Sequence, residues 1–279
     1  MNRRAAAWVI GLVTVIVVAA CGDQVPTQPE PRVADTLTTD RFLILDYAGT
    51  DTAVLNALAA RLESDFDGVG GLLPGIAPPA VPVTFIVDSG GGIPVVIADQ
   101  NTMVQWHDDL APAYFAHQLT HLYTRYTRTP FLEEGLAVWI TGELADSSER
   151  PNPYRGQSAH AWMSYFVQHQ STISLFTAMR ATNLGASYGG SSADASAWQL
   201  RVEAGSFARW VIETYGRGAW DTLYATTSLA TALGQDTPLI EQAWQDSVTN
   251  RVPAPLECEV ALGTVGSREE YWCARARGG

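Results

Sequence analysis

The sequence predicts an α+β fold, in which a small N-terminal mixed sheet with one helix is followed by a mainly helical lobe. Short apolar and β-branched runs at 41–47, 83–87 and 93–98 predict the strands. From residue 108 onward, apolar residues recur at helical spacing, which predicts the helical lobe. Of the 279 residues, 47% are hydrophobic and 16% are charged, a mixture that excludes a disordered chain.

The sheet lobe is assigned to residues 39–107. Its first strand is followed by an amphipathic helix at 52–66, where leucines and Phe66 recur at helical spacing. Glycines and prolines over 68–82 predict a loop before the second strand. Pro94 predicts that the third strand starts there or lies at an edge of the sheet, because proline cannot donate a ladder hydrogen bond.

The helical lobe is assigned to residues 108–252. Asp108 or Asp109 can cap a helix that runs to about residue 128. Thr129-Pro130 then stops this helix and starts the next, which covers 130–144. Further helices are expected at 158–169, 172–181, 197–215, 218–226 and 237–248. The glycine- and serine-rich segment 185–196 is expected to be a mobile loop.

The charge balance excludes one class of partner. All 17 basic residues are arginine, against 29 acidic residues, which gives a net charge of −12. The arginines form no basic cluster, and phosphate backbones require a positive face. We therefore expect no binding to nucleic acid.

The N-terminus has the features of an export signal. A basic start is followed by the uncharged apolar run Ala5–Ala20, and small residues directly precede Cys21. This arrangement resembles the lipobox of bacterial lipoproteins. The resemblance implies a signal peptide at 1–20, a lipid on Cys21 and a flexible tether over 21–38. The mature protein would be held on a membrane in the cell envelope, facing the periplasm or the cell surface. An ordinary signal peptide or a single membrane anchor are the alternatives.

The C-terminal tail, residues 253–279, contains the other two cysteines, Cys258 and Cys273. Outside the cytoplasm such a pair usually forms a disulfide, which would close a short loop here. A metal-binding pair is the alternative, but no histidine lies nearby. We therefore predict the disulfide.

Two histidines carry the strongest chemical signal. His117 and His121 are four positions apart in a predicted helix, so both imidazoles can face one ion. The next helix offers Glu133 and Glu134, and two histidines with one carboxylate leave an open position on zinc. Helix geometry alone does not separate the two glutamates, and a histidine pair satisfied by hydrogen bonds is the alternative. The other histidines lack such partners and are expected to be surface or capping residues: His107, His160 and His169.

The stretch from Ala116 to Leu144 resembles the zinc-site hairpin of gluzincin metallopeptidases, in particular the extracytoplasmic peptidase MA-like group. In that pattern a His-Glu-x-x-His helix precedes a Leu-x-Glu-Gly-Leu-Ala helix. The resemblance implies a zincin-like fold over 39–252 and Zn²⁺ bound by His117, His121 and Glu134. The segment 204–216 resembles a later helix of the same family.

One position departs from the family pattern. Gln118 follows the first histidine, where the family has the glutamate that takes a proton from zinc-bound water. An amide cannot accept that proton at neutral pH. We therefore expect peptide hydrolysis to be weak or absent. A zinc-bound or metal-free pseudopeptidase that binds a peptide or protein partner is the alternative, and a purely structural lipoprotein is a third.

Overall fold

The computed structural model describes residues 32–89, 95–107, 113–125, 128–144, 158–168, 170–181 and 192–251. All its helices and strands belong to the unit that begins at Val33. The predicted signal peptide, Cys21, most of the tether, and both Cys258 and Cys273 lie outside the described residues. Among the helices within these ranges, none is long and apolar enough to cross a bilayer.

A five-stranded mixed sheet begins the described part of the chain, with the strand order β1-β2-β3-β5-β4. Its strands are β1 (Asp35–Thr38), β2 (Phe42–Asp46), β3 (Val83–Asp88), β4 (Val95–Ile97) and β5 (Thr102–Trp106). The central strands β2, β3 and β5 are parallel, whereas β1 and β4 pair antiparallel at the two edges. The sheet of the predicted α+β fold is therefore confirmed, and the third predicted strand lies at an edge as expected.

Two strands were not predicted. The segment 35–38 was assigned to the tether, but its backbone pairs with β2, and its mostly exposed side chains leave no hydrophobic pattern to detect. In β5 the buried residues include polar Thr102 and Gln105. They interrupt the apolar run by which a strand is recognised in a sequence. The turn before β5 contains Asn101 with a positive φ of 52°, a conformation that asparagine tolerates well.

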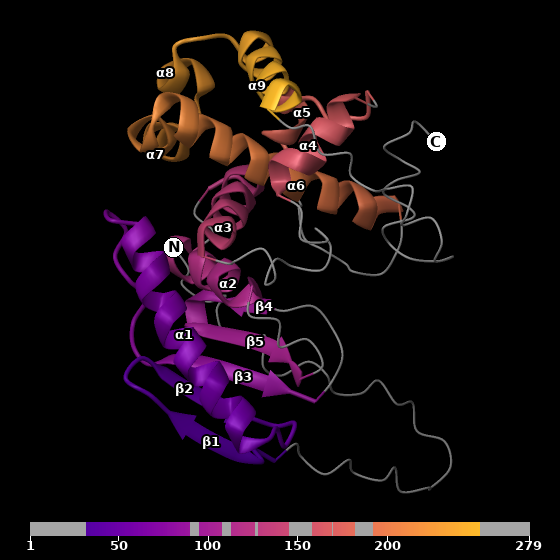
Figure 1. The fold of residues 1–279 in the computed structure, drawn as a ribbon. Coiled ribbons are helices and arrows are strands. Elements are labelled where there is room, and N and C mark those ends of the chain that lie inside the picture. Colours follow the sequence, from indigo (N-terminus) through magenta and orange to yellow (C-terminus); the bar gives the residue numbers. More distant parts are fainter. Residues whose placement is uncertain are drawn as a thin grey trace, which may run out of the picture. The chain divides into compact units, whose positions relative to one another are not determined.

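Helix α1 (Thr52–Leu72) packs on the sheet and also contacts the helical lobe (Figure 1). It buries Leu55, Leu58, Leu62 and Phe66, as the predicted amphipathic pattern required. The helix continues past residue 66 into the segment predicted as a loop. Two of its glycines, Gly68 and Gly70, lie where other helices approach. An added Cβ at Gly68 would be 2.9 Å from the Leu144 side chain, and one at Gly70 would be 2.9 Å from the Tyr123 hydroxyl.

The rest of the described chain is helical. It comprises α2 (Ala113–Thr124), α3 (Pro130–Leu144), α4 (Ala159–Gln168), α5 (Leu175–Ala178), α6 (Ser192–Tyr215), α7 (Arg217–Thr226), α8 (Leu229–Leu233) and α9 (Thr237–Arg251). Most of these match predicted helices within a few residues. Helix α6 begins inside the segment predicted as a loop, and the short α8 was not predicted.

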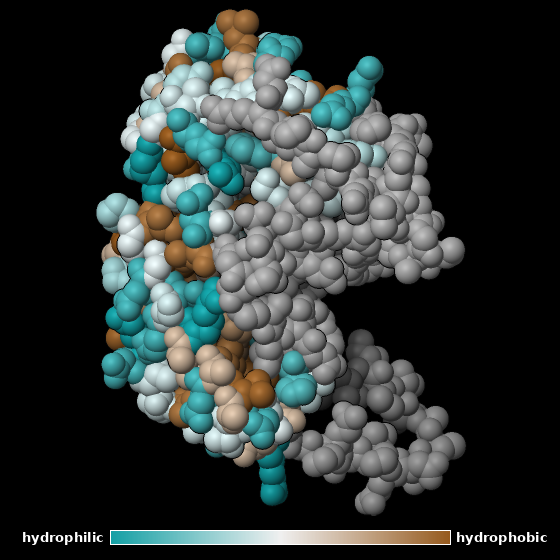
Figure 2. Space-filling view, viewed as in Figure 1, coloured by the Kyte–Doolittle hydropathy of each residue, from teal (hydrophilic) through white to brown (hydrophobic). Residues whose placement is uncertain are grey.

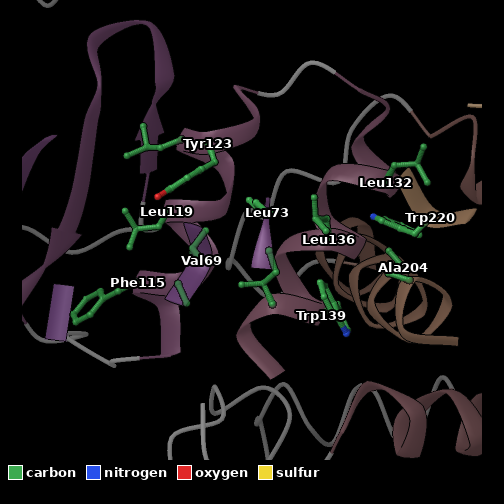
Figure 3. Packing of buried hydrophobic residues seen from close by; sticks show 14 of the residues in the cluster. Val69, Leu73, Phe115, Leu119, Tyr123, Leu132, Leu136, Trp139, Ala204 and Trp220 are labelled. Atoms are coloured by element: carbon green, nitrogen blue, oxygen red, sulfur yellow. The ribbon is translucent and has the colours of Figure 1, made fainter. Parts of the chain in front are cut away.

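One hydrophobic cluster connects the sheet and the helices. Helix α2 links them, because Phe115 packs edge-on against Phe85 of β3 and Tyr123 packs against Phe66 of α1. Helix α3 is buried on nearly all sides. In Figure 3 the α2 side chains lie on one side of α3, and Ala204 of α6 lies on the other. The metal-ligand candidates on α2 and α3 are therefore held by elements packed on both sides.

The surface is mixed in character. Hydrophilic and hydrophobic residues are interspersed over the coloured part of the face in Figure 2. The large exposed hydrophobic residues come from separate segments: Val33, Val54, Val81, Val95, Phe176 and Leu239. Scattered exposure of this kind is normal for a folded protein and indicates no particular partner.

Candidate metal centre

The α2–α3 hairpin is held by Glu133. Its buried carboxylate accepts hydrogen bonds from Thr124 Oγ1 at 2.7 Å, at the end of α2, and from the Arg128 backbone N–H at 2.8 Å. The backbone carbonyl of Thr129 accepts the first helical bonds of α3, and Pro130 is its first residue, as predicted. Glu133 thus fixes the connection between the two helices through bonds to Thr124 and Arg128.

His117 and His121 share one face of α2. Their Nε2 atoms are 3.1 Å apart, and the two rings meet edge-on at 81°. His121 is only 2% exposed, whereas His117 is partly open to solvent. The predicted convergence of the two imidazoles is therefore present in the structure.

Glu134 completes the cluster from α3. Its Oε2 atom lies 3.4 Å from His117 Nε2, and its Oε1 atom lies 3.6 Å from His121 Nε2. These three residues form a group of potential metal ligands among the described residues. In a tetrahedral zinc site with bonds of about 2.0–2.1 Å, neighbouring ligand atoms are roughly 3.3 Å apart. The three observed separations bracket this value, so the spacing of the ligand groups fits a zinc ion.

Close packing of α3 on α6 explains why glycine follows Glu134. An added Cβ at Gly135 would be 2.7 Å from the backbone oxygen of Ala204, a contact that real Cβ atoms essentially never make. One at Gly205 would be 2.2 Å from Val138 Cγ1. The two glycines let the helix backbones approach closely, next to the metal-ligand candidates.

This packing brings in Arg201, a residue that sequence reasoning missed. Its Nε atom lies 3.1 Å from Glu134 Oε2, and Nη2 lies 3.5 Å from Oε1. Arg201 is one helical turn before Ala204 in α6, and the segment that resembled a family helix began only at 204. Nothing in the sequence indicated which α6 side chain would meet Glu134.

The electrostatics favour the protonation states that bind metal. Burial lowers the pKa of His121 to about 3, although Glu134 opposes the shift. Burial acts to raise the pKa of the Glu134 carboxyl, but the Arg201 charge and both histidines outweigh it and hold that pKa below its ordinary value. His121 is therefore neutral and Glu134 ionised over the physiological range, as metal ligation requires.

Gln118 is buried beside the histidines on α2. It is 3% exposed, and neither polar atom of its amide has a hydrogen-bond partner among the residues that the structure describes. An unsatisfied buried amide costs about 1–3 kcal/mol, so such groups usually have a bound water or ligand as partner. This orphaned amide is the second feature of the site that fits a bound group.

The remaining histidines differ in their surroundings. His107 is exposed, as expected, and His169 lies outside the described residues. The prediction for His160 is wrong, because it is buried on α4 with Nδ1 2.8 Å from Ser206 Oγ of α6. The same hydroxyl accepts a hydrogen bond from Trp244 Nε1 at 3.1 Å. His160 therefore belongs to a polar network that joins α4, α6 and α9.

Comparison of the chain with protein-family models, curated proteins and solved structures gives no match. The resemblance to gluzincins therefore rests on the residues of the α2–α3 hairpin and on the later helix.

Proposed function

We propose that this protein is a lipid-anchored, zinc-binding protein of the cell envelope with a zincin-like fold, in which His117, His121 and Glu134 hold one Zn²⁺. The observation that carries the proposal is the spacing of the three ligand groups, at 3.1, 3.4 and 3.6 Å, close to the edge of a zinc tetrahedron. Three protein ligands leave the fourth position open, which is the arrangement of catalytic zinc sites.

The surrounding architecture also supports a zincin-like fold. The histidine helix α2 contacts the antiparallel edge strand β4, and α3 follows α2 through a short hairpin. An edge strand presents unpaired backbone groups to which an extended peptide can add. The expected partner of the site is therefore a peptide or an extended segment of a protein.

The chain's own residues predict weak or absent hydrolysis. A bound zinc ion supplies an acidified water molecule and polarises a carbonyl group. Gln118 can hold a water by hydrogen bonding, but its amide cannot take the proton. Glu133 offers no replacement base, because its carboxylate already accepts hydrogen bonds from Thr124 and the Arg128 backbone.

A second function is favoured by the same observations. A zinc-bound or metal-free pseudopeptidase would retain the peptide-binding face and lack the base at position 118. The ion pair between Arg201 and Glu134 favours the metal-free form, because the guanidinium neutralises the buried carboxylate without any metal.

The proposed location rests on the N-terminal residues. A lipid on Cys21 would tether the protein outside the cytoplasm, where Cys258 and Cys273 would form a disulfide. Metabolic labelling with a fatty-acid analogue, compared with Cys21→Ser, tests the lipid. Non-reducing peptide mapping tests the disulfide.

Zinc content of the purified protein tests the central proposal. We expect about one zinc per chain after dialysis against micromolar zinc, and loss of that zinc in His117→Ala. His107→Ala, which removes an exposed histidine that is not one of the three grouped residues, is the matched control and should retain the metal. A wild-type protein that takes up no zinc under these conditions would overturn the proposal.

A further inference from the structure

Glu134 lies between the candidate metal site and the positively charged side chain of Arg201. Its two carboxylate oxygens lie near the histidine Nε2 atoms, and the same two oxygens face the Arg201 guanidinium. We propose that Arg201 is an internal cation that holds Glu134 when no metal is bound, so that the guanidinium and the metal compete for one carboxylate. This inference rests on the proposed zinc site.

Burial explains why the metal-free protein needs such a cation. Glu134 is only 7% exposed and lies in a helix that is buried on nearly all sides. An ionised carboxylate in such a place is costly unless it is paired. The Arg201 side chain, with 15% exposure, is itself mostly buried against it. The ion pair therefore lets the hairpin keep its geometry without a metal.

Charge predicts the direction of the effect on metal binding. Partners behind a metal ligand normally orient it and raise its basicity, so that their loss weakens metal binding by roughly 10- to 100-fold. A guanidinium on the carboxylate does the opposite, because it draws electron density from the ligand and repels the incoming cation. In a buried site this repulsion is weakly screened. Removal of Arg201 should therefore strengthen zinc binding.

The fold allows the Arg201 guanidinium to move off the Glu134 carboxylate when a metal binds. The backbone of α6 is fixed against α3 by the contacts at Gly135 and Gly205, so Arg201 cannot leave by movement of its helix. Its long side chain has several rotatable bonds and can swing from the carboxylate while the backbone stays in place. The metal-free and metal-bound forms then differ in one side chain.

The test compares zinc affinity and metal-free stability in the full chain. Arg201→Gln and Arg201→Met both remove the charge, and the second keeps an apolar stem of similar length. Arg209→Gln is the matched control, since Arg209 lies on the same helix and pairs with Glu213 in an exposed ion pair. Zinc affinity is measured by competition with a chromophoric chelator, and stability by thermal unfolding in the presence of a chelator.

We expect both Arg201 variants to bind zinc roughly 10- to 100-fold more tightly than the wild type, because a nearby like charge is removed, and to unfold at lower temperature without metal. Arg209→Gln should leave both quantities near the wild-type values. If Arg201→Gln is too unstable without metal, Arg201→Met carries the same comparison. Zinc affinity that is unchanged or weaker in the Arg201 variants would overturn the inference.

The outcomes separate this inference from the proposed function. If the wild type binds zinc and the Arg201 variants bind it no more tightly, only the inference fails. If the wild type takes up no zinc but the variants do, the inference stands, and Arg201 is the residue that prevents zinc binding in the wild-type protein. If none of them takes up zinc, both fail.

Discussion

Glu133 and Glu134 are adjacent in α3, yet their carboxylates have different partners. Glu133 accepts hydrogen bonds from the end of α2 and from the connecting turn, whereas Glu134 faces His117, His121 and Arg201. Neighbouring helical residues point about 100° apart, so one turn of helix can hold both a structural and a ligating carboxylate. The two residues should therefore respond differently to the same substitution.

The first prediction compares Glu133→Gln with Glu134→Gln. Glu134→Gln should weaken zinc binding by more than the roughly 10- to 100-fold that an outer-shell partner contributes, because it removes a charged ligand. Glu133→Gln should leave zinc binding near wild type and lower the free energy of unfolding by about 1–2 kcal/mol, because it weakens one buried and one part-buried charge-assisted hydrogen bond. Chelator competition and denaturant unfolding measure the two quantities. Equal loss of zinc in both variants would contradict the assignment.

The second prediction concerns Gln118. If the site lacks only its base, Gln118→Glu should raise peptide hydrolysis by on the order of 10²- to 10⁴-fold and leave about one zinc bound per chain. A library of fluorogenic peptides measures the rate. Gln118→Met, which fills the same space without a carboxylate, should show no gain. A Gln118→Glu protein that binds zinc and cleaves nothing would favour the peptide-binding alternative.

The third prediction tests the close packing that places α6. Gly135→Ala should destabilise the protein by about 1–3 kcal/mol, because the new Cβ meets the Ala204 backbone oxygen and the helices must separate. Gly142→Ala on the same helix is the control, since a Cβ there meets nothing within 4 Å. It should be neutral or stabilising by up to about 1 kcal/mol. Denaturant unfolding of both variants gives the comparison, and similar values for the two would argue against the close approach.

The fourth prediction concerns acid stability of the sheet lobe. Burial acts to raise the pKa of the Glu63 carboxyl, but hydrogen bonds from Thr39 and Arg41 and the Arg41 charge lower it below its ordinary value of 4.5. A carboxyl whose pKa is lower in the folded state stabilises the fold fully above its unfolded pKa. This contribution is lost as the pH falls through the folded pKa.

Glu63→Gln should therefore cost stability near neutral pH, and the difference from wild type should shrink below about pH 4.5. Unfolding free energies of both proteins between about pH 3 and pH 7 measure this trend. Glu143→Gln, at an exposed position of α3, controls for the loss of one negative charge. A difference that stays constant across this range would show that the Glu63 carboxylate does not act through its charge.

Local sequence patterns predicted most of the helices and three of the strands, and the predictions failed at specific places. The helices at 52–66 and 130–144 were predictable, because apolar spacing and Pro130 are local signals. The extension of α1 past residue 66 was not predictable, because its glycines are accommodated by Leu144 and Tyr123 from distant segments. Strand β1 was not predicted for a related reason, since its extended conformation is held by backbone pairing with β2 and not by a hydrophobic pattern of its own.

The sequence by itself determined three of the five strands, most of the helices and the helical phase of His117 and His121, because these depend on residues a few positions apart. The family resemblance favoured Glu134 over Glu133, which helix geometry alone could not separate, and the tertiary structure places Glu134 beside these histidines. Only the tertiary structure decided that Arg201, 67 residues further along the chain, reaches the same carboxylate. That meeting depends on how closely α6 packs on α3. Packing between distant segments is set by the whole core and leaves no local pattern in the sequence.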